Sequence, residues 1–152
     1  MSSSTTPPHE EGRDDASERF VSCNPMRLIG FVALGGAAGS VARFLLGALL
    51  QSRDAGAFPW GTFTINLTGS LLLGFLLRVA MASTVMSPEL RALLTVGFCG
   101  GYTTFSTYSY ETAVLLESGH YGKAATYAVT SVVLALAGTF LGFMAAREFL
   151  DR

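Results

Sequence analysis

Polar side chains recur at helical spacing inside otherwise apolar stretches of the sequence. Thr62, Asn66 and Ser70 follow one another four residues apart and would share one face of a helix. A Ser or Thr hydroxyl can bond to a carbonyl one turn back, but the Asn66 amide carries two donors and an acceptor. Because such a group is costly against lipid, Asn66 predicts a helix interface or a polar pathway rather than a merely tolerated residue.

A second polar stripe runs through the last apolar stretch, where Tyr127 and Ser131 are continued by Ala135. Alone, this stripe could be hydrogen-bonding glue between helices. Together with the Asn66 face it indicates a track lined by hydroxyl groups. Arg43 lies near the end of the first apolar stretch. It could extend its charge towards the headgroups or stand at the mouth of a pore, and its position alone leaves both open.

The third apolar stretch contains the strongest local signal, Gly97, Gly100 and Gly101 within five residues. Each glycine destabilises an uninterrupted helix by about 1 kcal/mol. A break would free backbone groups, which membrane proteins tolerate only when they are buried or line a cavity. Freed carbonyls would suit a hard cation, whereas half-helix N-termini would favour anions. An unbroken glycine-rich packing interface is the alternative; the hydroxyl-rich residues that follow favour the break.

Two aromatic residues follow these glycines. Phe105 and Tyr108 are three residues apart and share a helix face. An aromatic ring is electropositive at its edge, so such rings can stabilise an anion without a fixed positive charge that would trap it. Aromatic pairs at this spacing more often reflect packing.

The elements that must position these residues are four apolar stretches, at about 26–50, 58–81, 90–116 and 124–146. Half of the 152 residues are hydrophobic, 14% are charged, and the mean hydropathy is +0.44. Each stretch approaches or exceeds the roughly 20 residues that cross a bilayer as a helix. We therefore expect an all-α integral membrane protein with four transmembrane helices, the third broken in mid-membrane.

The remaining residues set limits on orientation and on function. Residues 1–25 are polar and lack apolar periodicity, so we expect a disordered tail ahead of a membrane domain at 26–152. Positive charges concentrate on the side of the termini, which favours cytoplasmic termini: Arg27, Arg78, Arg91, Arg147 and Arg152 there, against Arg53 and Lys123 opposite. Without a basic stripe, nucleic-acid binding is not expected.

Beyond these patterns, three motifs resemble the signatures of the CrcB/Fluc fluoride channels. They are the runs at 35–44, 61–70 and 97–107, in order and correctly spaced, within a similarity that covers about 28–149. The resemblance implies a channel domain that pairs with a second subunit in an antiparallel dimer, with two fluoride pores. It also implies a structural sodium ion at the dimer centre, held by the backbone carbonyls of Gly100 and Thr103.

The family's functional positions carry over to this sequence residue by residue. The resemblance implies a fluoride pore lined by Thr62, Asn66, Phe105, Ser106, Thr107, Tyr108, Tyr127 and Ser131, with Arg43 and Glu111 in the vestibules. Tyr108 departs from the family, which usually has phenylalanine there. The implied function is passive export of fluoride from the cytoplasm across the cell (inner) membrane, which lowers internal fluoride toxicity.

Other functions stay open at this point. The arginine bias indicates that this chain could insert one way only and be one subunit of a heterodimeric channel, inactive alone, with an oppositely oriented paralogue as its partner. A proton-coupled exporter would need a carboxylate deep in the membrane, for which Glu111 is the candidate. An intramembrane hydrolase using Ser70 or Ser106 would lack a histidine base, because both histidines lie outside the apolar stretches. We therefore expect no enzyme.

Overall fold

The computed structural model describes residues 25–50, 57–82 and 86–151, and these residues form helices without a β-strand. Three long helices are α2 (Pro25–Leu50), α3 (Trp60–Ala82) and α7 (Tyr121–Leu150). The third apolar stretch is divided into α4 (Pro88–Arg91), η1 (Ala92–Cys99), α5 (Gly100–Tyr102) and α6 (Phe105–Glu117). The predicted all-helical class is confirmed. The tail before Pro25, and Arg53 and Arg152, lie outside the described residues.

Membrane-spanning length is met by single helices in three of the four predicted stretches. Helices α2, α3 and α7 have 26, 23 and 30 residues and are apolar enough to cross a bilayer. The third stretch reaches comparable length only when α4, η1, α5 and α6 are taken together, because its helical path is interrupted after Tyr102.

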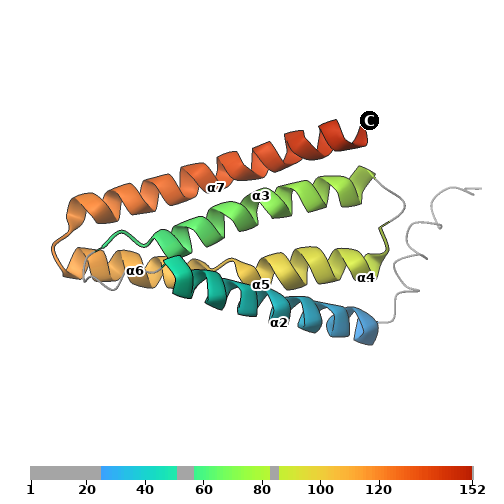
Figure 1. Ribbon diagram of the computed structural model, residues 1–152, viewed down its shortest axis with the longest axis horizontal. Coiled ribbons are helices and arrows are strands. Elements are labelled where there is room, and N and C mark those ends of the chain that lie inside the picture. The colour runs from blue at the N-terminus through green and yellow to red at the C-terminus, as the bar shows by residue number, and fades with distance from the viewer. Residues whose placement is uncertain (1–24, 51–56, 83–85, 152) are drawn as a thin grey trace, which may run out of the picture.

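The helices lie side by side (Figure 1): α3 and α7 run in one direction, and α2 and the third traverse run in the other. Helix α3 packs mainly against α7, and α2 packs mainly against η1 and α5. The start of α2 and the end of α7 lie at the same end of the bundle, and α6 lies at the opposite end (Figure 1). This arrangement agrees with four traverses and with termini on one side.

Glycines let these helix pairs approach backbone to backbone. A Cβ atom on Gly35 or Gly39 would overlap a carbonyl oxygen of the facing helix, at Leu93 or Phe98. On the other pair, a Cβ on Gly142 would overlap the Leu71 carbonyl. Small residues spaced four apart, as Gly35 and Gly39 are, allow such close approach of membrane helices.

Few side chains are buried within the described part of the chain. The buried apolar residues are Ile65, Cys99, Leu115, Ala124, Tyr127 and Ala146. By contrast, large apolar side chains such as Leu34, Phe44 and Leu49 point outwards along α2. In water this surface would be unfavourable, but it suits lipid tails or a second subunit.

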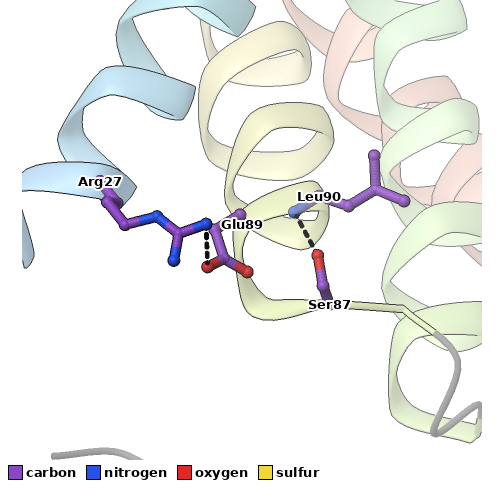
Figure 2. A network of polar contacts seen from close by, with 4 residues as sticks. All are labelled: Arg27, Ser87, Glu89 and Leu90. Carbon is purple, nitrogen blue, oxygen red and sulfur yellow. Dashed lines mark hydrogen bonds and ion pairs between the residues drawn. The ribbon is translucent and has the colours of Figure 1, made fainter. Parts of the chain in front are cut away.

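Polar contacts tie the start of α2 to the start of α4 (Figure 2). The Ser87 hydroxyl accepts from the Leu90 N–H at 3.2 Å and caps α4, and Pro88 occupies the first helical position, where its missing N–H is harmless. Glu89 in the first turn pairs with Arg27 of α2 at 3.5 Å. These contacts join the first and third traverses at the end of the bundle where α2 begins and α7 ends.

Candidate functional site

The helical path of the third traverse is interrupted by two threonines. Thr103 (φ −79°, ψ 158°) and Thr104 (φ −150°, ψ 116°) are extended, and α6 begins immediately afterwards at Phe105. The Thr104 hydroxyl then caps α6 by accepting from the Thr107 N–H at 3.2 Å. Threonine suits both tasks, because β-branched residues favour extended backbone and hydroxyls are preferred helix caps.

The glycines just before this interruption are themselves helical. Gly97 belongs to η1, which has π-helical hydrogen bonding, a rare form that recurs at functional sites. Gly100 and Gly101 form the last helical turn before the interruption. The sequence predicts that the chain leaves the helix at the glycines, whereas in the structure it leaves the helix a few residues later, at Thr103. Gly97 and Gly101 instead provide close packing, since a Cβ on either would collide with the backbone of α2.

Asn66 holds the interrupted backbone with both ends of its amide. Its Nδ2 donates to the Thr104 carbonyl at 3.0 Å, and its Oδ1 accepts from the Thr104 N–H at 2.8 Å. In an uninterrupted helix that N–H would donate to the Gly100 carbonyl. The side chain of α3 therefore replaces the helical partner. Of the two roles predicted for Asn66, the helix interface is seen directly, and the pathway is considered below.

Helix α2 supplies donors to the carbonyls around the interruption. The Ser40 hydroxyl donates to the Gly101 carbonyl at 3.5 Å, and the Arg43 Nη1 donates to the Thr103 carbonyl at 3.4 Å. Arg43 is half-buried and its side chain bonds to the protein, which fits a protein-facing position better than extension into the headgroups. The two carbonyls predicted to hold sodium differ: Thr103 accepts from Arg43, whereas Gly100 loses its helical donor to Asn66.

A first cavity of about 360 Å³ lies on one side of Thr104, between α3, the interruption and α7. It brings together four residues predicted for the pore, Asn66, Phe105, Tyr108 and Ser131. The Ser131 Oγ is buried and has no hydrogen-bond partner within the described residues. None of the described residues that line this cavity is charged.

Sequence reasoning missed Thr104, described above, and one further polar residue of this cavity, Thr139. Its hydroxyl donates to the Ala135 carbonyl at 3.1 Å and lies 3.4 Å from the Ser70 carbonyl, which joins α7 to α3. Thr139 continues the four-residue spacing of Tyr127, Ser131 and Ala135. That spacing was the available signal, and the polar stripe is one turn longer than predicted.

A second cavity, of about 660 Å³, lies between α2, α3 and α6, and Thr104 lines it as well. The two residues predicted for the vestibules, Arg43 and Glu111, meet here. Three residues predicted for the pore also line this cavity and not the first one: Thr62, Ser106 and Thr107. The polar residues of the site are thus divided between two cavities that adjoin at Thr104.

The Glu111 carboxylate lies at the meeting point of three helices. The Thr62 hydroxyl donates to its Oε1 at 2.9 Å, and the Tyr127 hydroxyl donates to its Oε2 at 2.8 Å. Hydrogen bonds to an ionised carboxylate are about twice as strong as neutral ones. Tyr127 is fully buried (0% exposed) and lines neither cavity. Tyr127 therefore supports Glu111 through a hydrogen bond from the buried interior. The resemblance implied a place for Tyr127 in the pore lining and did not indicate this contact.

The aromatic residues form a connected row along α6 and α7. The Phe105 and Tyr108 ring centroids are 5.4 Å apart with planes inclined at 41°, and the Tyr108 and Tyr127 centroids are 5.3 Å apart at 52°. Phe105 is 77% exposed within this single chain. The Tyr108 hydroxyl donates to the Ala128 carbonyl at 3.3 Å. The predicted sharing of one face by Phe105 and Tyr108 is confirmed.

Comparison with known proteins adds an independent line. The family described as "CrcB-like protein, Camphor Resistance (CrcB)" matches residues 30–143. A protein of Geobacter sulfurreducens named Fluoride-specific ion channel FluC is 49% identical over 117 residues, which cover 77% of this chain and 94% of that protein. A protein of the same name from Rhizobium meliloti is 44% identical over 125 residues, 82% of this chain and all of that protein. A third, from Thermus thermophilus, is 49% identical over 112 residues, 74% of this chain and 89% of that protein.

Proposed function

The chain belongs to the CrcB-like protein family, and from this premise we propose that it is a fluoride-selective channel through which fluoride leaves the cytoplasm passively. The apolar helices and the family together make it a multi-pass membrane protein. The structural observation that best supports a pore is the buried Ser131 hydroxyl, which has no partner among the described residues and lies in a cavity where none of them is charged.

The cavity has the chemistry that an unhydrated fluoride ion needs. Fluoride is small and strongly hydrated, so a pore must replace its water with other donors. A buried hydroxyl without a partner costs about 1–3 kcal/mol, and an anion that accepts from Ser131 would recover that energy. Asn66 keeps one N–H beyond the one that it gives to Thr104. The ring edges of Phe105 and Tyr108 add positive potential without a net charge.

Passive flow suffices for export. A negative-inside potential drives an anion outwards by about 2.3 kcal/mol per 100 mV. Fluoride enters acidified cells as neutral HF and dissociates inside, so a leak for the ion lowers its internal level. No covalent step or energy coupling is required.

We place the interruption of the third traverse near the middle of the bilayer. Helices α4, η1 and α5 run over residues 88–102 and would rise about 20 Å, and the 13 residues of α6 would rise about 20 Å as well. Each half is too short to cross a hydrocarbon core of about 30 Å alone. The sum is long enough, which puts Thr103 and Thr104 at depth.

We further propose an antiparallel pair of subunits with a sodium ion between them. The donor set fits this ion, because backbone carbonyls suit hard cations and the Gly100 carbonyl has lost its helical donor. Gly100 is exposed and would meet nothing within 4 Å if it had a Cβ. Thr103 fits less closely, since its carbonyl accepts from Arg43, although only at 3.4 Å and with a second lone pair left. A bound sodium would offset the negative ends of the carbonyl dipoles.

One observation favours a second candidate, a subunit that conducts only with an oppositely oriented relative. Among the described residues, Arg27, Arg78, Arg91 and Arg147 belong to the helix ends near the start of α2 and the end of α7, whereas Lys123 is in the first turn of α7 and Arg43 is about two turns from the end of α2. Such a bias directs the more positive end to the cytoplasm. A chain with one fixed orientation cannot form an antiparallel homodimer.

Efflux from liposomes that contain this chain alone tests the proposal. We expect release of fluoride and not of chloride, and a loss of at least tenfold in Phe105→Ile, which removes a ring of the first cavity. Phe140→Ile is the matched control, because Phe140 is similarly exposed (63%) but lines neither cavity. Release that appears only with a co-expressed relative would favour the second candidate. Equal chloride release, or none of either ion in both preparations, would overturn the channel function.

A further inference from the structure

The sequence leaves two roles open for the Tyr108 hydroxyl. It could point into the first cavity as a donor to the ion, or it could serve the protein. In the structure it donates to the Ala128 carbonyl of α7 at 3.3 Å; Tyr108 lines the first cavity, whereas Ala128 does not. The hydroxyl proton is thus given to a carbonyl of a residue that does not line the cavity.

The direction of the ring follows from this bond. A phenol oxygen lies on the axis about which its ring rotates, so a bond at that oxygen fixes where the axis points and leaves the ring plane to its neighbours. Those neighbours are Phe105 and Tyr127, whose ring centroids are 5.4 Å and 5.3 Å from that of Tyr108. Because the hydroxyl end of the Tyr108 ring is bonded to α7, we infer that the ring carbons of Tyr108 border the cavity.

A second bond joins the same two helices in the opposite sense. Tyr108 of α6 donates to α7 at Ala128, and Tyr127 of α7, the preceding residue, donates to Glu111 of α6. Both bonds link α6 to α7 and lie within about one helical turn of each other, so they hold the two helices together beside the cavity. Phe105 has no hydroxyl of its own and rests against Tyr108, so the position of its ring depends on that of Tyr108.

We propose that Tyr108 is a positioning residue whose hydroxyl tethers its ring to the Ala128 carbonyl and does not bind fluoride. This inference rests on the proposed function, because it concerns the rings that the ion would pass. An aromatic ring attracts anions at its edge and repels them at its face. The tether fixes the axis of the ring and its neighbours Phe105 and Tyr127 hold its plane. Loss of the tether would let the ring tilt, and so slow the ion without removing a ligand.

Tyr108→Phe tests this tether, because it removes the oxygen and keeps the ring. We expect the maximal rate of fluoride efflux to fall several-fold, while the fluoride concentration at half-maximal rate changes less than twofold. In a chain carrying ¹³C=¹⁸O at Ala128, the carbonyl stretching band should move to higher wavenumber, because that carbonyl loses a donor. Tyr121→Phe is the control; Tyr121 is 69% exposed at the start of α7 and lines neither cavity.

Three results would overturn the inference. A several-fold rise in the half-maximal concentration with an unmoved Ala128 band would make the hydroxyl a fluoride ligand. An unmoved band with unchanged efflux would mean that the tether does not exist. A shifted band with an unchanged rate would leave the tether without a positioning role. If the unmodified chain released no fluoride at all, the proposed function would fail instead, and the Ala128 band would still decide whether the tether exists.

Discussion

Replacing Asn66 with leucine tests whether one side chain of α3 holds the interrupted third traverse. Leucine has nearly the same shape but neither donates nor accepts, so the Thr104 N–H and carbonyl both lose the partner that they have at 2.8 Å and 3.0 Å. Thr104 is buried, so water does not readily replace that partner. We expect the variant to be less stable and its interruption to be less well defined.

The size of the effect follows from the two bonds. Hydrogen bonds between helices in membrane proteins contribute about 0.6 kcal/mol on average and up to about 1.7 kcal/mol. A buried polar group left without a partner costs about 1–3 kcal/mol. Two bonds therefore set a lower limit of about 1 kcal/mol and an upper limit of about 6 kcal/mol. We expect Asn66→Leu to lower the free energy of unfolding by about 2–4 kcal/mol, because the Thr104 N–H can partly return to the Gly100 carbonyl.

Unfolding in detergent micelles with increasing SDS would measure this loss. The chain has a single tryptophan, Trp60 at the start of α3, whose ring contacts Phe58 and whose fluorescence reports unfolding. Thr130→Val is the control, because within the described part of the chain the Thr130 hydroxyl bonds to its own helix, at the Thr126 carbonyl. A change below about 0.5 kcal/mol in Asn66→Leu, together with unaltered hydrogen exchange at the Thr104 amide, would refute the reasoning.

Two further variants test the helix packing and the hydrogen bonds of Glu111. Gly39→Leu forces a side chain into the Phe98 carbonyl, so we expect the free energy of unfolding to fall by at least about 2 kcal/mol in the same assay. Gly30→Leu is the control, because a side chain there meets open space and should change the free energy of unfolding by less than about 0.5 kcal/mol; equal losses in the two variants would contradict the close packing. Glu111→Gln keeps the shape but weakens two charge-assisted bonds, so we expect a loss of about 1–2 kcal/mol and slower fluoride efflux, and an equal effect of Glu117→Gln, at the exposed end of α6, would contradict it.

The helices themselves could be predicted because their signal is local. Apolar stretches at 26–50, 58–81 and 124–146 became helices over 25–50, 60–82 and 121–150. The length of an apolar run sets the length of a membrane helix directly. The last helix extends beyond its apolar run at both ends, because backbone hydrogen bonding continues into polar residues once a helix has formed.

The exact position of the interruption in the third traverse could not be predicted from the local sequence. Glycine composition indicated weakness at 97–101, yet the helix continues to Tyr102 and the extended residues are Thr103 and Thr104. The difference comes from Asn66, which is 38 residues away in the chain and binds both backbone groups of Thr104. The residues around the interruption give no indication of a hydrogen-bond partner so distant in the sequence.

The sequence by itself determined which polar residues stand in apolar helices and which faces they occupy, because spacing along one helix is enough for that. Only the tertiary structure decided where they meet. It divided them between two cavities, with Asn66 and Ser131 on one side of Thr104 and Thr62 and Glu111 on the other. It also turned the Tyr108 hydroxyl to α7. Hydrogen-bond partners on different helices depend on how those helices pack, and packing is a property of the whole chain.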